Sequence, residues 1–220
     1  MKIIECVPNF SEGRDKSKIT TIKNSISRIS GVKLLDVDPG FDTNRTVVTF
    51  VGDLDSVVEA AFCAIKTASE LIDMRVHSGA HPRMGATDVC PFIPVSGVSM
   101  EECIYLSKML GKRVGEELGI PVYLYEKSAA NEERKNLAVI RKGEFEGMND
   151  KMEQNAWKPD FGPDSCHKTA GVTAIGARKF LIAYNINLNT MDRKIASNIA
   201  LDIREAGRAK RDKNGKIIRD

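Results

Sequence analysis

The order of strand-like and helix-like segments in the first part of the chain constrains its fold more than any other feature. The turn at residues 39–44 is too short for a crossover connection, so the two strands that it joins are expected to pair antiparallel. Five short apolar runs are typical of strands: residues 2–8, 31–38, 45–53, 87–95 and 120–127. Three longer segments are typical of helices: residues 15–30, 54–73 and 99–119.

This order, β-α-β-β-α-β followed by α-β, is the split-βαβ or ferredoxin-like pattern. We therefore expect an α+β fold, with a ferredoxin-like sheet and helices on one face. The other face must also be covered, because the strand at residues 87–95 is apolar on both sides. Ser99 and Glu102 form the sequence pattern of a capping box, and Gly119 is expected to end the helix that follows it.

The remainder of the chain is less regular. Residues 128–152 are charged and are expected to be helical in pieces, while residues 153–179 show no clear periodicity. A long irregular segment inside a compact domain is usually functional or disordered, and this one has the composition of an ordered segment. Residues 180–189 predict a strand and residues 190–208 a helix. We therefore expect one subdomain over residues 1–179 and the first strand and helix of an incomplete second α/β subdomain over residues 180–220. A strand and a helix cannot bury themselves alone, so this pair docks on the first subdomain, is completed by a partner, or belongs to a truncated unit.

Composition excludes several classes of protein. The chain has 220 residues with a net charge of +3, which is too mild to predict a nucleic-acid binder. No apolar segment is long enough to span a bilayer, and no signal peptide is recognisable, so no membrane association is expected. The five cysteines include no pair at C-x-x-C spacing. They predict free thiols in a reducing compartment and hence a cytoplasmic location.

Two of the three histidines lie in the stretch "HSGAHPRMGATDVCPFIPV", residues 77–95. His77 and His81 have the spacing of zinc ligands on a helix, but Gly79 between them and Pro82 after them disfavour a helix there. No third ligand stands at a suitable spacing, so we do not expect a metal. Two interpretations stay open on residue types alone: imidazoles held by backbone hydrogen bonds, and a catalytic group.

The surroundings of His81 favour the catalytic interpretation. Arg83 places a fixed positive charge nearby, which disfavours the imidazolium and leaves a neutral ring able to accept a proton. Asp38, at the end of its strand, could orient His81 or bind an amine, although a solvated turn carboxylate explains it equally well. The stretch "GVTAIGARK" is not a phosphate loop, because Ala177 and Arg178 stand where Lys and Ser/Thr are needed.

Several of these stretches resemble one known family. "ECVPNFSEG", "LLDVDPGFDTNRTVVTFVG", "HSGAHPRMGATDVCPFIPV", "PVYLYE", "WKPDFGP" and "GARKFLIAYNINL" are similar to the formiminotransferase domain of glutamate formimidoyltransferases and bifunctional formimidoyltransferase-cyclodeaminases. The resemblance implies transfer of the formimino group from N-formimino-L-glutamate to N5 of tetrahydrofolate, a reaction of histidine degradation and one-carbon metabolism.

The resemblance also implies roles for individual residues. The catalytic acid/base of the family falls on His81, and an acidic residue that lines its site falls on Asp38. Tetrahydrofolate would be a co-substrate, and no metal would be needed. Both substrates carry carboxylates, for which Arg83, Arg178, Lys179 and Arg45 are candidate anchors. The family's folate-binding stretch falls on Gly162, Pro163, Asp164, Ser165, Cys166, His167, Lys168, Thr169, Ala170 and Gly171.

The family has a complete second subdomain, and its site lies between the two. We therefore also consider an alternative, in which the chain is a catalytically impaired folate-binding fragment or a partner subunit. An uncovered apolar face in the incomplete second subdomain would favour a homodimer.

Overall fold

The computed structural model describes residues 2–182, 186 and 188–203. The chain divides into two compact units, Met1–Phe180 and Leu181–Asp220. The first unit contains all of the strands found in the described residues. The interpretation of residues 180–220 as the start of an incomplete second subdomain stays a prediction.

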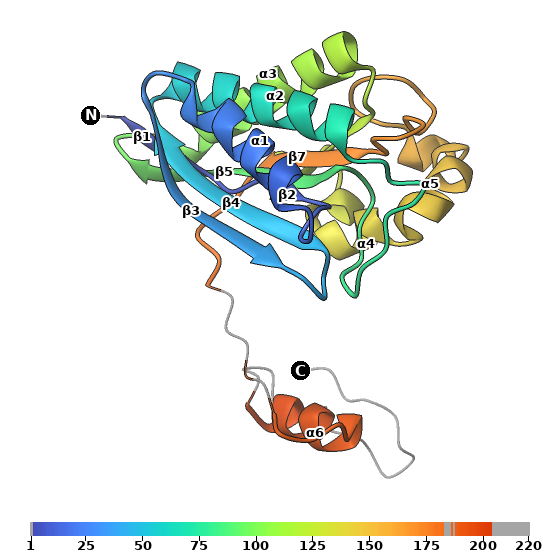
Figure 1. Ribbon diagram of the computed structural model, residues 1–220. Coiled ribbons are helices and arrows are strands. Elements are labelled where there is room, and N and C mark those ends of the chain that lie inside the picture. The colour runs from blue at the N-terminus through green and yellow to red at the C-terminus, as the bar shows by residue number, and fades with distance from the viewer. Residues whose placement is uncertain (1, 183–185, 187, 204–220) are drawn as a thin grey trace, which may run out of the picture. The chain divides into compact units, whose positions relative to one another are not determined.

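The first unit is built on one seven-stranded sheet (Figure 1). β1 and β2 follow one another between β4 and β5, because each of them pairs antiparallel with both of those strands. β3 and β4 form the predicted antiparallel hairpin, and β7 lies parallel between β5 and β6. The strands are β1 (Ile3–Cys6), β2 (Asn9–Phe10), β3 (Val32–Gly40), β4 (Arg45–Gly52), β5 (Thr87–Ser96), β6 (Val122–Glu126) and β7 (Thr173–Ala177).

Three long helices cover one face of the sheet, which we call the helix face (Figure 1). Asp15 and Asp53 cap the first two of them with side-chain oxygens. Ser99 and Glu102 form the predicted capping box of the third, which ends at Gly119 in a left-handed conformation with φ of 64°. These helices are α1 (Lys16–Ser27), α2 (Leu54–Leu71) and α3 (Met100–Leu118).

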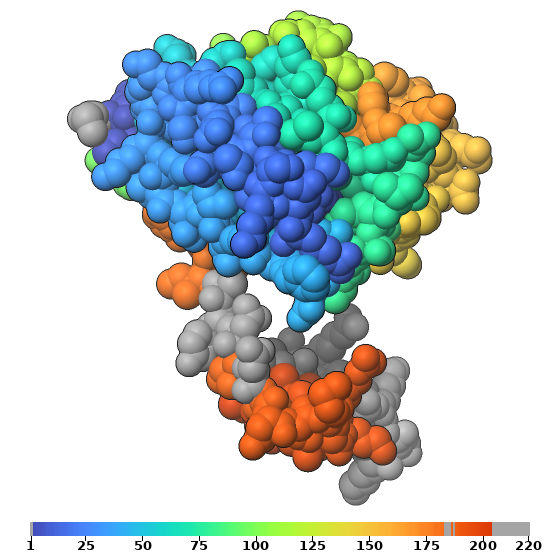
Figure 2. Space-filling view, viewed as in Figure 1, coloured from blue at the N-terminus to red at the C-terminus, as the bar shows by residue number. Residues whose placement is uncertain are grey.

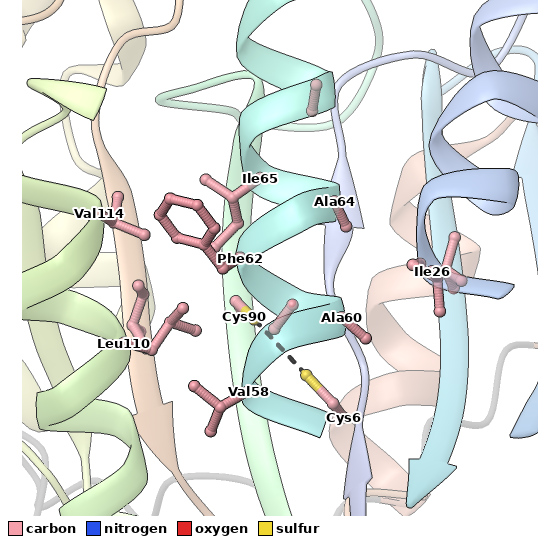
Figure 3. Close-up of a cluster of buried hydrophobic side chains, with 14 of the residues drawn as sticks. Cys6, Ile26, Val58, Ala60, Phe62, Ala64, Ile65, Cys90, Leu110 and Val114 are labelled. Carbon is pink, nitrogen blue, oxygen red and sulfur yellow. Dashed lines mark hydrogen bonds between the residues drawn. The ribbon is translucent and has the colours of Figure 1, made fainter. Parts of the chain in front are cut away.

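The main core lies between these helices and the sheet. Figure 3 shows α2 with its alanines, including Ala60 and Ala64, on the side of Ile26 from α1. On its other side, Phe62 points toward Val114 of α3. The small alanine side chains allow α1 to pack closely, and the space-filling view shows the three helices side by side, coloured from blue to green (Figure 2).

Two short helices, α4 (Leu137–Arg141) and α5 (Glu144–Met152), pack on the opposite face, which we call the second face. Ile140 and Met148 join a second buried cluster with Tyr123 and Tyr125 of β6, whereas Val122 of β6 belongs to the main core. Because side chains alternate between the faces of a strand, the two clusters lie on opposite sides of the sheet. The α+β class is confirmed. The three long helices lie on one face, and α4 and α5 cover the other face, which the sequence predicts to be covered.

Residues 128–152 are helical in pieces, as predicted: the 3-10 helix η1 (Glu132–Lys135) precedes α4 and α5. Residues 153–179 contain the short 3-10 helix η2 (Asn155–Trp157) and also β7, which the sequence analysis missed. The small residues of β7 have low strand propensity. They suit this position because a Cβ at Gly176 would collide with the backbone oxygen of Tyr125 in β6.

In the second unit the structure describes one helix, α6 (Arg193–Ile203), within the predicted residues 190–208. Residues 204–208 lie outside the described residues, as do residues 183–185 and 187 of the strand predicted over residues 180–189. The described part of that segment, residues 180–182, 186 and 188–189, forms no strand. A strand requires a pairing partner, and the described residues of this unit supply none.

All five cysteines are free thiols, and three of them are buried. The sulfur atoms of Cys6 and Cys90 approach to 3.6 Å in the core, as the dashed line in Figure 3 marks. Burial raises the pKa of the Cys6 thiol, so the protonated form is favoured. None of the helices within the described residues combines the length and the apolar character needed to cross a bilayer.

Candidate active site

One edge of the sheet gathers the residues that the sequence analysis singled out around His81. β4 and β5 both run antiparallel to β1, and β3 runs antiparallel to β4. The end of β3 and the beginnings of β4 and β5 therefore meet at the same edge. Asp38 near the end of β3, Arg45 at the start of β4 and His81 before β5 are brought to this edge.

The ring of His81 is half-buried, and one hydrogen bond sets its tautomer. Its Nδ1 lies 2.6 Å from the carbonyl oxygen of Pro82. A carbonyl oxygen can only accept, so Nδ1 must carry the hydrogen. In the neutral ring Nε2 is then left as an unprotonated acceptor, which is the state that a general base requires.

Burial lowers the pKa of His81 below its ordinary value of 6.5, and the positive charge of Arg45 lowers it further. Arg141 acts in the same direction, while the hydrogen bond to Pro82 and the charge of Asp88 oppose the shift. The sequence predicts a lowered pKa of His81, which is the direction observed, but points to Arg83 as the cause. The structure shows that the nearby cations are Arg45 and Arg141.

His77 differs from His81 in that both of its ring nitrogens have protein partners. Its Nε2 lies 2.9 Å from the carbonyl oxygen of Asn44, and its Nδ1 accepts from Nε of Arg83 at 3.3 Å. Arg83 itself is buried and donates to Glu144 at 2.7 Å and to Glu146 at 2.6 Å. These bonds occupy the guanidinium group, so anchoring a substrate carboxylate at Arg83 would require it to leave them.

A β-bulge in β3 decides which way Asp38 points. The pairing with β4 shifts between Leu34 and Asp36, after which Asp36 pairs with Thr49 and Asp38 with Val47. Asp38 therefore projects from the same face as Asp36, next to Val47 and two residues along β4 from Arg45. The side chain is exposed, and in the described structure no hydrogen bond joins it to His81.

Arg45 belongs to a buried ionic cluster that the sequence analysis did not identify. The carboxylate of Asp88 is fully buried and accepts from Nη1 of Arg45 at 2.5 Å and from Nη2 of Arg141 at 2.7 Å. Nε of Arg45 donates to Asn9 at 3.1 Å. The sequence feature that indicates such a cluster is Asp88 itself, an aspartate inside an otherwise apolar strand, because a buried carboxylate requires a partner.

Arg178 and Lys179 lie at the other edge of the sheet. They follow the last residue of β7, which runs parallel to β5, so about 15 Å of strand separates them from the level of His81. Arg178 is nevertheless within electrostatic range of Tyr125, and Tyr125 of Arg45. The side chain of Lys179 is exposed.

The stretch 162–171 supports the loop that carries His81. The backbone of His167 pairs with that of Gly171, and Nδ1 of His167 accepts from the backbone nitrogen of Ala170 at 3.0 Å. The carbonyl oxygen of Ala170 accepts from the nitrogen of Ala86 at 2.8 Å, and Gly171 pairs with Gly85. Ala170 and Gly171 are buried, whereas residues 162–165 and 168 are exposed.

No three His, Cys, Asp or Glu side chains gather in the described residues as a metal ion would require. Among its own groups the site offers a neutral imidazole, two guanidinium groups and an exposed carboxylate.

Comparison with known proteins shows the family to which the chain belongs. Residues 3–178 match the family described as formiminotransferase domain, N-terminal subdomain. A formimidoyltransferase-cyclodeaminase of Dictyostelium discoideum is 55% identical over 208 residues, which cover 94% of this chain and 38% of that protein. The protein of the same name from Rattus norvegicus is 54% identical over 216 residues, or 98% of this chain and 40% of its own length.

A shorter relative, the glutamate formimidoyltransferase of Streptococcus pyogenes serotype M1, is 52% identical over 206 residues. The match covers 94% of this chain and 69% of that protein. The chain thus spans about two fifths of the longer relatives and about two thirds of the shorter one. By the extent of these matches, the chain belongs to the family of the N-terminal subdomain of the formiminotransferase domain.

Proposed function

We propose that this protein takes part in the transfer of the formimino group from N-formimino-L-glutamate to N5 of tetrahydrofolate, as an enzyme of histidine degradation and one-carbon metabolism. Membership of the family and the names of its relatives support this proposal. The observation that carries it is the hydrogen bond from Nδ1 of His81 to Pro82, which leaves Nε2 as the base.

His81 moves one proton in this proposal. As N5 of tetrahydrofolate attacks the formimino carbon, Nε2 accepts the proton that N5 loses. The same imidazole then donates that proton to the glutamate nitrogen, and the bond between this nitrogen and the formimino carbon breaks. A group with a pKa near neutrality can perform both steps, and the lowered pKa of His81 favours the first.

Other residues at the edge have supporting roles in the proposal. The exposed carboxylate of Asp38 stabilises the cationic centre that develops on the formimino group. Arg45 anchors a substrate carboxylate, and Arg178 and Lys179 act at the far edge of the sheet, where the glutamate tail of folate would extend. The exposed residues of the stretch 162–171 contact folate.

We also propose that residues 3–96 form a split-βαβ, ferredoxin-like unit. The strand order β5, β1/β2, β4, β3, with every neighbouring pair antiparallel, supports this assignment. α1 connects β2 to β3, α2 connects β4 to β5, and both lie on the helix face. The strands β7 and β6 extend this unit at the β5 side.

The proposal includes tetrahydrofolate as a co-substrate, and no metal, nucleic acid or membrane as a partner. A homodimer and a cytoplasmic location remain part of it as predictions, the latter consistent with five free thiols.

The proposal is tested by replacing His81. In His81→Ala, formimino transfer to tetrahydrofolate is expected to fall by about 10²- to 10⁴-fold, the usual contribution of a general acid/base. Added imidazole should restore part of the rate. In the unmodified protein, kcat/KM should decrease on the acid side with a midpoint below 6.5, because the pKa of His81 is lowered.

Two outcomes would count against the proposal. Equal activity of His81→Ala and the unmodified protein would remove the role of this residue. Folate binding without turnover, at saturating N-formimino-L-glutamate, would instead favour the alternative of a folate-binding protein.

A further inference from the structure

The cluster of Arg45, Asp88 and Arg141 has a net charge of one positive unit, because two guanidinium groups share one carboxylate. Asp88 supplies one negative charge to two guanidinium groups, whose side chains keep only 10% and 13% of their surface exposed. An uncompensated charge with so little contact with water is costly. The cluster is therefore poised to take a small anion with a single charge.

The backbone is shaped to direct Asp88 into this cluster. The pairing of β2 with β5 shifts between Asn9, which pairs with Val89, and Phe10, which pairs with Thr87, so that Asp88 is an inserted residue. Such a bulge turns a side chain away from its regular direction. Asp88 consequently joins Arg45 on the second face, and its Oδ1 accepts from the backbone nitrogen of Met84 at 3.0 Å. Asp88 is a positioning residue that holds both cations.

Each guanidinium group keeps a donor for a ligand. Arg45 uses Nε and Nη1 in its bonds to Asn9 and Asp88, and Arg141 uses Nε and Nη2 in its bonds to Asp88. Within the described residues, no acceptor is bonded to Nη2 of Arg45 or Nη1 of Arg141. Two terminal N–H groups from two arginines suit the two oxygens of a carboxylate.

We propose that Arg45 and Arg141 together bind the α-carboxylate of the formimino donor. This inference rests on the proposed function, because it names the part of the donor that the site recognises. Both arginines are close enough to His81 to affect its charge. The α-carboxylate is attached to the carbon that bears the reacting nitrogen, so it is the carboxylate that must lie beside His81. A more distant carboxylate, such as that of the folate tail, would lie farther from this ring.

The test uses calorimetric titration with two ligands, N-formimino-L-glutamate and its α-amide, N-formimino-L-isoglutamine. The unmodified protein is expected to bind the α-amide about 10- to 100-fold more weakly, the usual value of a charged hydrogen-bonded pair. Arg141→Gln should weaken binding of N-formimino-L-glutamate by a similar factor and should no longer distinguish the two ligands. Its KM for the donor should rise more than its kcat falls, while its KM for tetrahydrofolate stays unchanged.

Arg28→Gln is the matched control, because it removes the same charge from an exposed position at the end of α1. It should bind both ligands as the unmodified protein does. Arg141→Gln keeps the Arg45–Asp88 pair, and the comparison of the two ligands on the unmodified protein requires no variant at all.

Equal binding of the two ligands by the unmodified protein, or binding of neither, overturns the inference. So does an effect of Arg141→Gln on tetrahydrofolate alone. Discrimination between the two ligands without any formimino transfer would support the carboxylate site while refuting the proposed function. Formimino transfer by a protein that binds the two ligands equally would support the proposed function and refute the carboxylate site.

Discussion

His77 and His81 stand four residues apart in one loop, yet their rings are held in different ways. The ring of His77 is bonded through both nitrogens, to Asn44 and to Arg83. Within the described residues, that of His81 is bonded through Nδ1 only, which leaves its Nε2 as the acceptor. The third histidine, His167, accepts through Nδ1 and would carry its hydrogen on Nε2. The three histidines therefore differ in their hydrogen-bond partners, and these partners distinguish the proposed base, His81, from the other two.

At the same scale, Asp88→Ala should be strongly destabilising. It leaves the guanidinium groups of Arg45 and Arg141 largely buried without their shared carboxylate. Removing one partner of a buried ion pair costs about 3–5 kcal/mol in the free energy of unfolding, which urea denaturation would measure. Asp150→Ala, at an exposed position of α5, should change the free energy by less than about 0.5 kcal/mol. Similar values for the two variants would contradict the importance of this cluster.

At the scale of elements, β-bulges and close backbone contacts bring the functional groups to one edge. The bulge in β3 turns Asp38 to the second face, where Arg45 lies, and the bulge in β5 turns Asp88 to the same face. The loop that carries His81 is then held from behind, because Gly85 pairs with Gly171. The irregular stretch 153–179 thus has a structural role in addition to any contact with folate.

Gly85→Ala tests this contact between the two loops. A Cβ at residue 85 would collide with the carbonyl oxygens of Val172 and Ala170, which are backbone atoms and cannot move aside easily. We expect a loss of about 1–3 kcal/mol in the free energy of unfolding, together with reduced activity through displacement of His81.

Gly147→Ala is the matched control for Gly85→Ala. Gly147 lies inside α5, and apart from its chain neighbours and the backbone of its own helix, no described atom lies within 4 Å of the position of its Cβ. This variant should be neutral or more stable by up to about 1 kcal/mol, because alanine favours a helix. Equal stability of the two variants would show that the Gly85 contact is unimportant.

At the scale of the whole molecule, the free energy of unfolding should depend on pH below about 6.5, where the histidines titrate. Burial lowers the pKa of both His77 and His81 below 6.5 in the folded protein. Below pH 6.5 the unfolded chain therefore binds more protons than the folded chain, and the free energy of unfolding decreases as the pH falls toward the lowered pKa values. Carboxyl groups whose pKa is lowered, such as Asp73 at about 2, contribute only at more acidic pH.

Urea denaturation at pH 7.5, 6.5 and 5.5, chosen to bracket the ordinary pKa, would measure this dependence. In His81→Gln the decrease between the two lower pH values should be smaller, because one of the two groups is absent. A free energy of unfolding that stays constant or rises on acidification would show that neither ring is held in its neutral form.

Local patterns were sufficient to predict much of the fold. The periods of α1 to α3, the capping box at Ser99 and the short turn between β3 and β4 each depend on neighbours in sequence, and all are confirmed. The histidine loop was likewise recognisable from residues 77–86 alone. β7 was not predicted because three of its five residues are alanine or glycine, which have low strand propensity and form a strand here only between β5 and β6.

The sequence by itself determined the α+β class, the order of the main elements and the residues around His81 that match the family, because these follow from local propensity and motif. Only the tertiary structure decided that α4 and α5 cover the second face, that Arg83 is bound to glutamates and that Asp88 joins Arg45 to Arg141. Arg45 and Asp88 differ by 43 in residue number, and Asp88 and Arg141 by 53, so only strand pairing and packing bring them together. The physical reason is that charge balance and hydrogen-bond partners in a buried site depend on distances in space.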